Sequence, residues 1–239
     1  MVDPVPVYIN NRNRLTTTRG LIDYLRNVPG AYPIIVDNAS TYPPLLAWYD
    51  RCGVEIVYCV FNIGPRAPWL IGHPLMSSYA HYAVTDSDLD LAGVPIDLFD
   101  VLRRGLDQHP RPVKAGLSLE ISDLPIDIES TAVIRTWEDQ FWQRFHNGWW
   151  QADVDTTFAL YRSGVDWPGR HWPGLHPAVR ADRPYTARHM PWYRANTEED
   201  RYYEQHVDPR WSTWSNWDAP IATQPARAQH LQCMRQHAT

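Results

Sequence analysis

Two carboxylates, Asp86 and Asp88, stand one residue apart at the end of the apolar run 82–85. This run predicts a short buried strand, and side chains at positions i and i+2 of an extended chain point to the same side. Both carboxylates can therefore face one ion. Oxygen ligands of this kind suit Mg²⁺ or Mn²⁺, which proteins often share with substrate phosphates. The pattern predicts a divalent metal site and phosphate-linked chemistry at this strand end.

Polar clusters recur along the first half of the chain. Short apolar runs predict strands at residues 5–9, 33–36, 54–61 and 82–85. Each run is followed by a polar cluster, at residues 10–14, 37–41, 62–66 and 86–90. Helical patterns between the strands imply βαβ units and a parallel sheet. Ligands of such sheets bind at the carboxyl ends of the strands, so the four clusters are expected to share one site.

Helix and strand signals also predict the elements around these clusters. A helix through Val28 is expected to be capped by Thr16 or Thr17, and a second helix over 43–49 is expected to be capped by Ser40 or Thr41. Further on, helices are predicted at 97–108 and 131–145, and strands at 113–121 and 156–161. From Pro168 the chain is rich in Pro, Trp, Arg and His and shows little periodicity, which predicts irregular structure. We expect the last 15 or so residues to be disordered.

Composition limits the class of protein. The 239 residues, with 44% hydrophobic and 21% charged side chains, are typical of one globular α/β domain. A net charge of −5 gives no basic footprint for nucleic acid. Three cysteines without CxxC spacing do not predict a disulfide framework or a zinc site. No run approaches the roughly 20 apolar residues of a membrane span, and no leader pattern is seen, so a soluble, cytoplasmic protein is expected.

Taken together, the segments PVYINNR (6–12), IIVDNAST (34–41), NIG (62–64) and TDSDL (85–89) resemble the nucleotide-sugar glycosyltransferases of the GT-A fold, in particular family 2-like members. The second and fourth segments, about 50 residues apart, are the specific ones. The resemblance implies a single catalytic domain over 1–239, with a mostly parallel, Rossmann-like sheet that carries an antiparallel strand. Residues 1–110 would bind the nucleotide sugar, residues 111–195 would face the acceptor, and residues 196–239 would form an extension.

The resemblance also implies roles for matching residues. Asp37 would bind the base, typically uracil, and Asp86 would contact the ribose or the metal. Asp88 and His189 would ligate Mn²⁺ or Mg²⁺, and Arg188 would reach a phosphate. The other residues expected at the nucleotide sugar are Asn10, Asn11, Arg12, Asn38, Asn62, Arg66 and Ser87.

A carboxylate on the acceptor side is expected to act as general base. In an inverting transfer the acceptor hydroxyl loses its proton as it attacks the anomeric carbon, and a positioned carboxylate can accept that proton. Glu138 matches the family's downstream carboxylate pair best, followed by Asp139, and Asp155 is a third candidate. The expected donor is a UDP-linked sugar. The acceptor would be a glycan, a lipid-linked molecule or a small molecule, and peripheral membrane contact is compatible with the sequence.

Other interpretations remain open at this stage. Asp37 can also serve as a turn or capping residue, and Glu138 and Asp139 can form a solvated helix face. A sugar-phosphate nucleotidyltransferase would want a Gly-rich loop and a Lys after the first strand, where the chain has Asn-Asn-Arg-Asn-Arg. The twelve tryptophans also allow a non-enzymatic carbohydrate-binding module.

Overall fold

The computed structural model describes residues 3–108, 111–126, 129–164, 178–193 and 196–208. Within these ranges no helix is long and apolar enough to cross a membrane.

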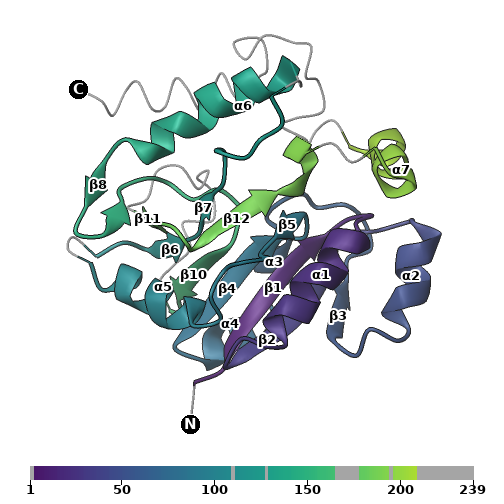
Figure 1. Cartoon of the computed structure of the whole chain (residues 1–239). Coiled ribbons are helices and arrows are strands. Elements are labelled where there is room, and N and C mark those ends of the chain that lie inside the picture. Colours follow the sequence, from purple (N-terminus) through teal and green to yellow (C-terminus); the bar gives the residue numbers. More distant parts are fainter. Residues whose placement is uncertain (1–2, 109–110, 127–128, 165–177, 194–195, 209–239) are drawn as a thin grey trace.

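The first half of the chain alternates strands and helices (Figure 1). Its strands are β1 (Val5–Asn11), β2 (Ala31–Asp37), β3 (Glu55–Tyr58) and β4 (His81–Asp86). Its helices are α1 (Thr16–Leu25), α2 (Pro43–Tyr49), α3 (Ala67–Leu70) and α4 (Leu75–Ser78). The strands are parallel neighbours in the order β3-β2-β1-β4. In this register Asn11 lies opposite Asp37 and Asn10 opposite Asp86, so the polar strand ends meet at one edge.

The second half extends this sheet. This half contains the helices α5 (Leu98–Leu106) and α6 (Glu129–Glu138). The strands that it adds to the sheet are β6 (Lys114–Gly116), β8 (Phe145–His146), β9 (Trp149–Trp150), β10 (Ala159–Arg162) and β11 (Ala178–Ala181). The nine-stranded sheet has the order β3-β2-β1-β4-β10-β6-β11-β9-β8. Strand β10 runs antiparallel between β4 and β6, whereas β11 is parallel to β6.

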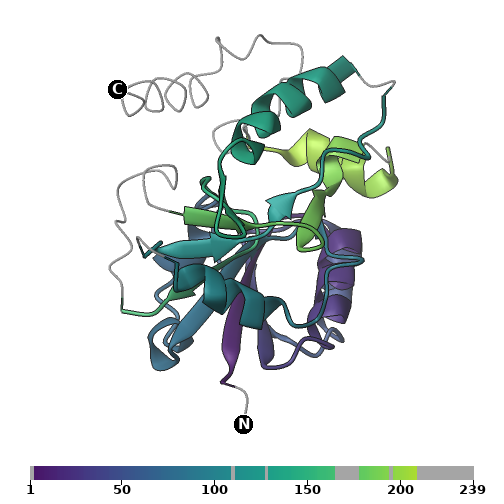
Figure 2. The ribbon, with the colours of Figure 1, turned by 60° about the vertical axis from the view of Figure 1, so that its left-hand side comes forward.

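A small second sheet crosses the carboxyl ends of the parallel strands. It consists of β5 (Leu89–Asp90), β12 (Thr186–His189) and β7 (Ser118–Leu119), in the order β5-β12-β7. A 3-10 turn, η3 (Met190–Tyr193), and helix α7 (Glu198–His206) follow. In both views α6 and α7 lie beyond the end of the sheet that is opposite the N-terminus (Figures 1 and 2).

Period-2 alternation places apolar side chains on both faces of the large sheet. Val7 and Ile9 belong to the core cluster that also contains buried residues of α1 and α5. Tyr8, between them, belongs to a second cluster with Val84 and Tyr161. A sheet buried on both faces is typical of parallel α/β architecture. The predicted α/β fold is therefore confirmed.

Several predicted boundaries differ from the structure. The predicted strand 113–121 is split between the two sheets, as β6 and β7. The predicted helix 131–145 ends at Glu138 and continues as the 3-10 turn η1 (Asp139–Trp142). Strand β10 begins at Ala159 rather than Thr156, because residues 156–158 form a bend.

The predicted helix caps are wrong. Leu15 and Tyr42 occupy the N-cap positions of α1 and α2, without side-chain caps. The predicted capping hydroxyls make tertiary contacts instead: Ser40 Oγ accepts from Asn13 N at 2.9 Å, and Thr16 Oγ1 donates to Glu199 at 2.9 Å.

The region after Pro168 contains regular elements where it is described, namely β11, β12 and α7. The last 15 residues, expected to be disordered, lie outside the described residues.

Candidate metal and nucleotide site

Asp86 ends β4, and Asp88 follows in the turn that leads to β5. Asp86 is held by Thr156, whose hydroxyl donates to Asp86 Oδ2 at 2.6 Å. A backbone hydrogen bond joins the same two residues, from Asp86 N to Thr156 O at 3.0 Å. Ser87, between the two carboxylates, is buried. The Asp-x-Asp turn is therefore fixed against the segment that precedes β10.

His189 is brought to Asp88 by the small sheet. In the pairing of β12 with β5, His189 lies opposite Leu89, and Met190 N donates to Asp88 O at 2.9 Å. As a result His189 Nε2 lies 3.5 Å from Asp88 Oδ2. Asp88 Oδ1 and His189 Nδ1 are buried and have no hydrogen-bond partner among the described residues.

The charges of Asp86, Asp88 and His189 affect one another. Burial, together with the charge of Asp88, raises the pKa of Asp86 well above its ordinary value, and Thr156 opposes that rise. Burial also raises the pKa of Asp88, but His189 and Arg14 outweigh it and hold this pKa below its ordinary value. The two neighbouring carboxyl groups thus have pKa values shifted in opposite directions, that of Asp86 upward and that of Asp88 downward.

These residues fit a divalent cation. Within the described part of the chain, Asp88 Oδ1 and His189 Nδ1 have no hydrogen-bond partner, and buried polar atoms normally have one. Carboxylate oxygen and imidazole nitrogen are both ligands of Mn²⁺. Among the described residues, no three His, Cys, Asp or Glu side chains are already gathered in a ligand set. Asp88 and His189 are therefore the side chains best placed to hold the ion, with Asp86 beside them.

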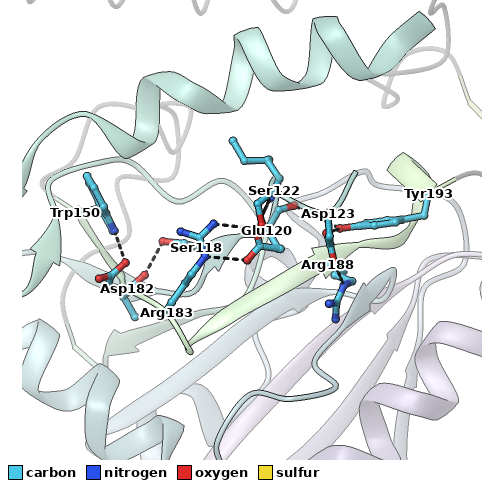
Figure 3. Close-up of polar contacts among 11 residues, drawn as sticks. Ser118, Glu120, Ser122, Asp123, Trp150, Asp182, Arg183, Arg188 and Tyr193 are labelled. Carbon is cyan, nitrogen blue, oxygen red and sulfur yellow. Dashed lines mark hydrogen bonds and ion pairs between the residues drawn. The ribbon is translucent and has the colours of Figure 1, made fainter. Parts of the chain in front are cut away.

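A polar network holds β12, and with it His189, in place (Figure 3). The Glu120 carboxylate accepts hydrogen bonds from Arg183 Nε at 3.1 Å and Nη2 at 2.8 Å, and Glu120 N donates to Ala187 O. Asp123 accepts from Arg188 Nε at 2.7 Å and from the Tyr193 hydroxyl at 2.6 Å. Arg188, predicted to bind phosphate, therefore forms an ion pair with Asp123 in this structure.

Asp37 lies at the end of β2, where its carboxylate is engaged by the local turn. Oδ1 accepts from Ser40 N at 2.9 Å, and Oδ2 accepts from the Tyr49 hydroxyl at 2.8 Å. Asn11 donates to the same hydroxyl at 2.8 Å. Asp37 is only 2% exposed. A nucleotide base could therefore bind this carboxylate only through its remaining lone pairs.

The other predicted donor-side residues shape the same edge. Arg12 Nη1 donates to Asn38 O at 2.9 Å and to Ala39 O at 2.7 Å. The Asn38 side chain ties β2 to the next loop, through Ile63 N and Gly64 O. Asn62 Oδ1 accepts from Gly64 N, and Arg66 is the N-cap residue of α3. Asn10 Oδ1 is buried and has no hydrogen-bond partner among the described residues.

Helix α7 contributes residues that the sequence did not predict. Arg14 Nη1 lies 2.6 Å from Asp200 Oδ1, and the guanidinium sits 3.9 Å from the centre of the Tyr203 ring. Thr41 O accepts from the Tyr202 hydroxyl at 2.9 Å. These contacts hold α7 against the carboxyl ends of β1 and β2. Of these residues, only Arg14 was indicated by the sequence, through its position in the polar cluster after the first strand. No sequence pattern near α7 indicates that this helix packs at the same edge of the sheet.

The three predicted acceptor-side carboxylates differ in their surroundings. The Glu138 side chain is 2% exposed and forms an ion pair with Arg180, which is equally buried. Burial raises the pKa of Glu138, and Arg180 opposes that rise. Asp139 is exposed at the start of η1. Asp155 is exposed and has no hydrogen-bond or ion-pair partner among the described residues.

Asp155 also belongs to the same electrostatic neighbourhood as the candidate metal ligands. Its charge raises the pKa values of both Asp86 and Glu138, while His189 lowers that of Glu138. The charge of Asp155 therefore acts on Asp86 and on Glu138.

No protein-family model matches the chain, and no curated protein matches its sequence. Solved structures do match. The mannosyltransferase PcManGT from Pyrobaculum calidifontis, in complex with GDP-Man and Mn²⁺, is similar over 100% of this chain and 77% of its own, with 11% identity and a TM-score of 0.52. GalNAc-T7, solved with UDP, GalNAc and Mn²⁺, is similar over 98% of this chain and 55% of its own, with 10% identity and a TM-score of 0.48. On the first of these likenesses and the strand order above, the chain has the fold of the GT-A nucleotide-sugar glycosyltransferases.

Proposed function

We propose that this protein is a metal-dependent glycosyltransferase that moves a sugar from a nucleoside diphosphate sugar to a hydroxyl acceptor. The observation that carries the proposal is the pair Asp88 and His189, which lie 3.5 Å apart beside Asp86. Each keeps a buried oxygen or nitrogen atom that has no hydrogen-bond partner among the residues the structure describes. This pair lies at the carboxyl edge of the sheet, where ligands of α/β folds bind. The structure of PcManGT with GDP-Man and Mn²⁺ supports the same substrate class and the same ion here.

The proposed roles follow from the positions of the side chains. Asp88 and His189 would hold Mn²⁺ or Mg²⁺, with Asp86 as the third ligand after a small movement. When bound, the ion offsets the negative charge that the leaving nucleoside diphosphate gains. Arg14, whose charge already acts on Asp88, would add to this positive potential. Asp37 remains our proposal for the base contact, and a UDP-linked sugar remains the proposed donor.

We further propose that the transfer inverts the anomeric centre and that Asp155 is the general base. A base must reach the proton of the acceptor hydroxyl, so it needs an accessible and unpaired carboxylate. Asp155 meets this requirement, whereas Glu138 is buried and paired with Arg180. Asp139 is accessible too, which makes the two exposed residues the ones to compare by mutation.

The first experiment measures release of nucleoside diphosphate from UDP-, GDP- and dTDP-sugars, with Mn²⁺, Mg²⁺ or EDTA. We expect one donor to turn over only with metal, and Asp88→Ala to abolish that turnover. Asp90→Ala is the matched control, because Asp90 serves its own turn by accepting from Ala92 N. A panel without release, together with no change in melting temperature on adding UDP and Mn²⁺, would contradict the proposal and favour a carbohydrate-binding module.

The base assignment is tested with the donor that this panel identifies. Asp155→Asn should lower transfer by about 100-fold or more, the range that a lost general base produces, with little change in nucleotide binding. If Asp139→Asn lost transfer and Asp155→Asn kept it, the assignment would pass to Asp139.

A further inference from the structure

Two buried cations, Lys114 and Arg180, lie against the segment that carries Asp155. Lys114 is 0% exposed, donates a hydrogen bond to Val154 O, and lies 2.9 Å from Asp153 Oδ1. Arg180 Nε donates to Asp153 O at 2.5 Å. The two cations therefore hold the backbone of consecutive residues just before Asp155.

Arg180 is itself fixed by Glu138 and Phe141. Its Nη1 forms an ion pair with Glu138, and its guanidinium lies 4.1 Å from the centre of the Phe141 ring. Burying a charge is costly unless the charge is paired and hydrogen-bonded. The ion pair and the bond to Asp153 O meet that requirement, so the direction of the guanidinium is strongly restricted.

The same segment is also held from the other side. Thr156 is bonded to Asp86 through both its hydroxyl and its carbonyl. Under the segment, Gly116 leaves just enough room: a Cβ at this position would lie 2.7 Å from Val154 Cγ1 and 2.8 Å from Phe158 O. Residues 153, 154 and 156 are thus fixed, while Asp155 between them is exposed.

We propose that Lys114, Arg180 and Glu138 form a buried clamp that positions Asp155 relative to Asp86. This inference rests on the proposed function, in which Asp155 acts on the acceptor. It gives Glu138 a role without contact to substrate: Glu138 orients Arg180, and Arg180 holds the Asp153 carbonyl. All three are positioning residues, and Asp155 is the group that they present.

Hydrogen exchange tests the clamp without any substrate. Glu138→Gln keeps an acceptor for Arg180 but removes the charge, and Arg180→Lys keeps the charge but cannot reproduce two bonds in one plane. We expect at least tenfold faster exchange of the Val154 and Asp86 amides, which bond to Asp153 Oδ1 and Thr156 O. Amides in the middle of β1 should be unchanged.

The matched control is Asp107→Asn. It removes the acid from another ion pair of the sheet, the one with Arg162 at the far end of β10, where the two atoms lie 2.7 Å apart. This variant should leave the exchange of Val154 and Asp86 as it is in the original protein. If both clamp variants left these amides unchanged, or raised exchange equally throughout β1, the clamp proposal would be overturned.

A kinetic measurement separates positioning from overall stability. With the donor identified above, Glu138→Gln should lower kcat by about tenfold or more while KM for the donor stays the same, because misplacing a reacting group lowers the rate without loosening the donor. Equal kcat values for Glu138→Gln and the original protein would overturn the proposal. Failure of the proposed function itself would look different: the original protein would then release no nucleoside diphosphate, although the exchange result would still report on the clamp.

Discussion

At the scale of single residues, the neighbouring side chains of Thr156 and Thr157 differ in the hydrogen bonding of their hydroxyl groups. The Thr156 hydroxyl donates to Asp86 Oδ2 at 2.6 Å. The Thr157 hydroxyl is buried and has no hydrogen-bond partner among the described residues. Groups that orient a metal ligand affect metal affinity, whereas an unpartnered buried hydroxyl only carries a desolvation cost.

We therefore expect Thr156→Val to weaken Mn²⁺ binding by about 10- to 100-fold, as is typical when a partner of a metal ligand is lost. Titration calorimetry with Mn²⁺ in the presence of UDP measures the effect. Thr157→Val is the control, because it makes the same substitution at the neighbouring position, and this variant should bind Mn²⁺ like the original protein. Equal losses in the two variants would indicate a general packing defect instead of support for Asp86.

The sequence predicts some of these residues and misses others for a physical reason. Asp86, Asp88 and His189 have recognisable types and neighbours, and the structure brings them together. Thr156, Lys114 and Arg180 matter through contacts with residues far away in the chain, and no local pattern reports such contacts. The contacts of Asp37, in contrast, are with Ser40 and Tyr49, which lie only 3 and 12 residues away in the chain.

At the scale of elements, helix α5 packs closely on the sheet at Gly105. A Cβ at this position would lie 2.7 Å from Trp149 Cη2 and 2.8 Å from Ala115 Cβ. Gly20, in α1, is exposed, and a Cβ built there meets no heavy atom of the described residues within 4 Å beyond its chain neighbours and its own helix backbone. The two helical glycines thus differ in the space around a Cβ.

Gly105→Ala should lower the free energy of unfolding by about 1–3 kcal/mol, because the indole of Trp149 must move. Gly20→Ala should raise it by about 0.5–1 kcal/mol, because alanine is the better helix former where space is free. Urea denaturation of both variants measures the difference. If the two substitutions changed stability in the same direction, the close packing of α5 would not be the cause.

Helix α7 depends on its capping box. Thr197 Oγ1 accepts from Asp200 N at 3.1 Å, and the Asp200 carboxylate, which accepts from Thr197 N, also binds Arg14. Thr197→Ala should lower the local free energy of opening of α7 by about 1 kcal/mol. Hydrogen exchange of the Arg201 amide, which bonds to Thr197 O, gives the measurement. Thr136→Ala in α6 is the matched change without a cap, and it should leave α7 unaffected.

The elements show how far sequence patterns reach. The strands of the parallel half are predicted, because their apolar alternation and polar ends are local features. Strands β6 and β7 are read as one strand, since nothing in 113–121 reveals that Leu117 N bonds to Phe158 O and the chain then changes sheets. Strands β11 and β12 follow a Pro- and Trp-rich stretch, and their pairing partners lie far away in the chain.

At the scale of the whole molecule, Glu120 couples stability to pH. Burial raises the pKa of its carboxyl group, but hydrogen bonds from Arg183 and Ser122 outweigh burial and lower the pKa to about 2. A carboxylate with a lowered folded-state pKa stabilises the fold above its unfolded-state pKa of about 4.3 and loses that contribution as the pH falls toward 2.

Glu120→Gln should therefore flatten the loss of unfolding free energy between about pH 4.5 and pH 2. At neutral pH the variant should be less stable, because the charge-assisted bonds to Arg183 are weaker with an amide. Urea denaturation across this pH range, compared with the original protein, gives the measurement. Parallel curves for the two proteins would show that Glu120 does not carry this dependence.

The small sheet that joins β5 to β12 has a consequence for synthesis of the chain. A nascent chain emerging from the ribosome presents Asp86 and Asp88 well before His189 exists, because β12 is synthesised long after β5. If these residues bind the ion as proposed, the closing of this long chain segment must precede tight binding, because contacts between distant residues form only after the cost of loop closure is met. Metal affinity would then report that β12 has docked on β5, and pulse-labelled folding intermediates in which β12 is undocked should be unable to retain Mn²⁺.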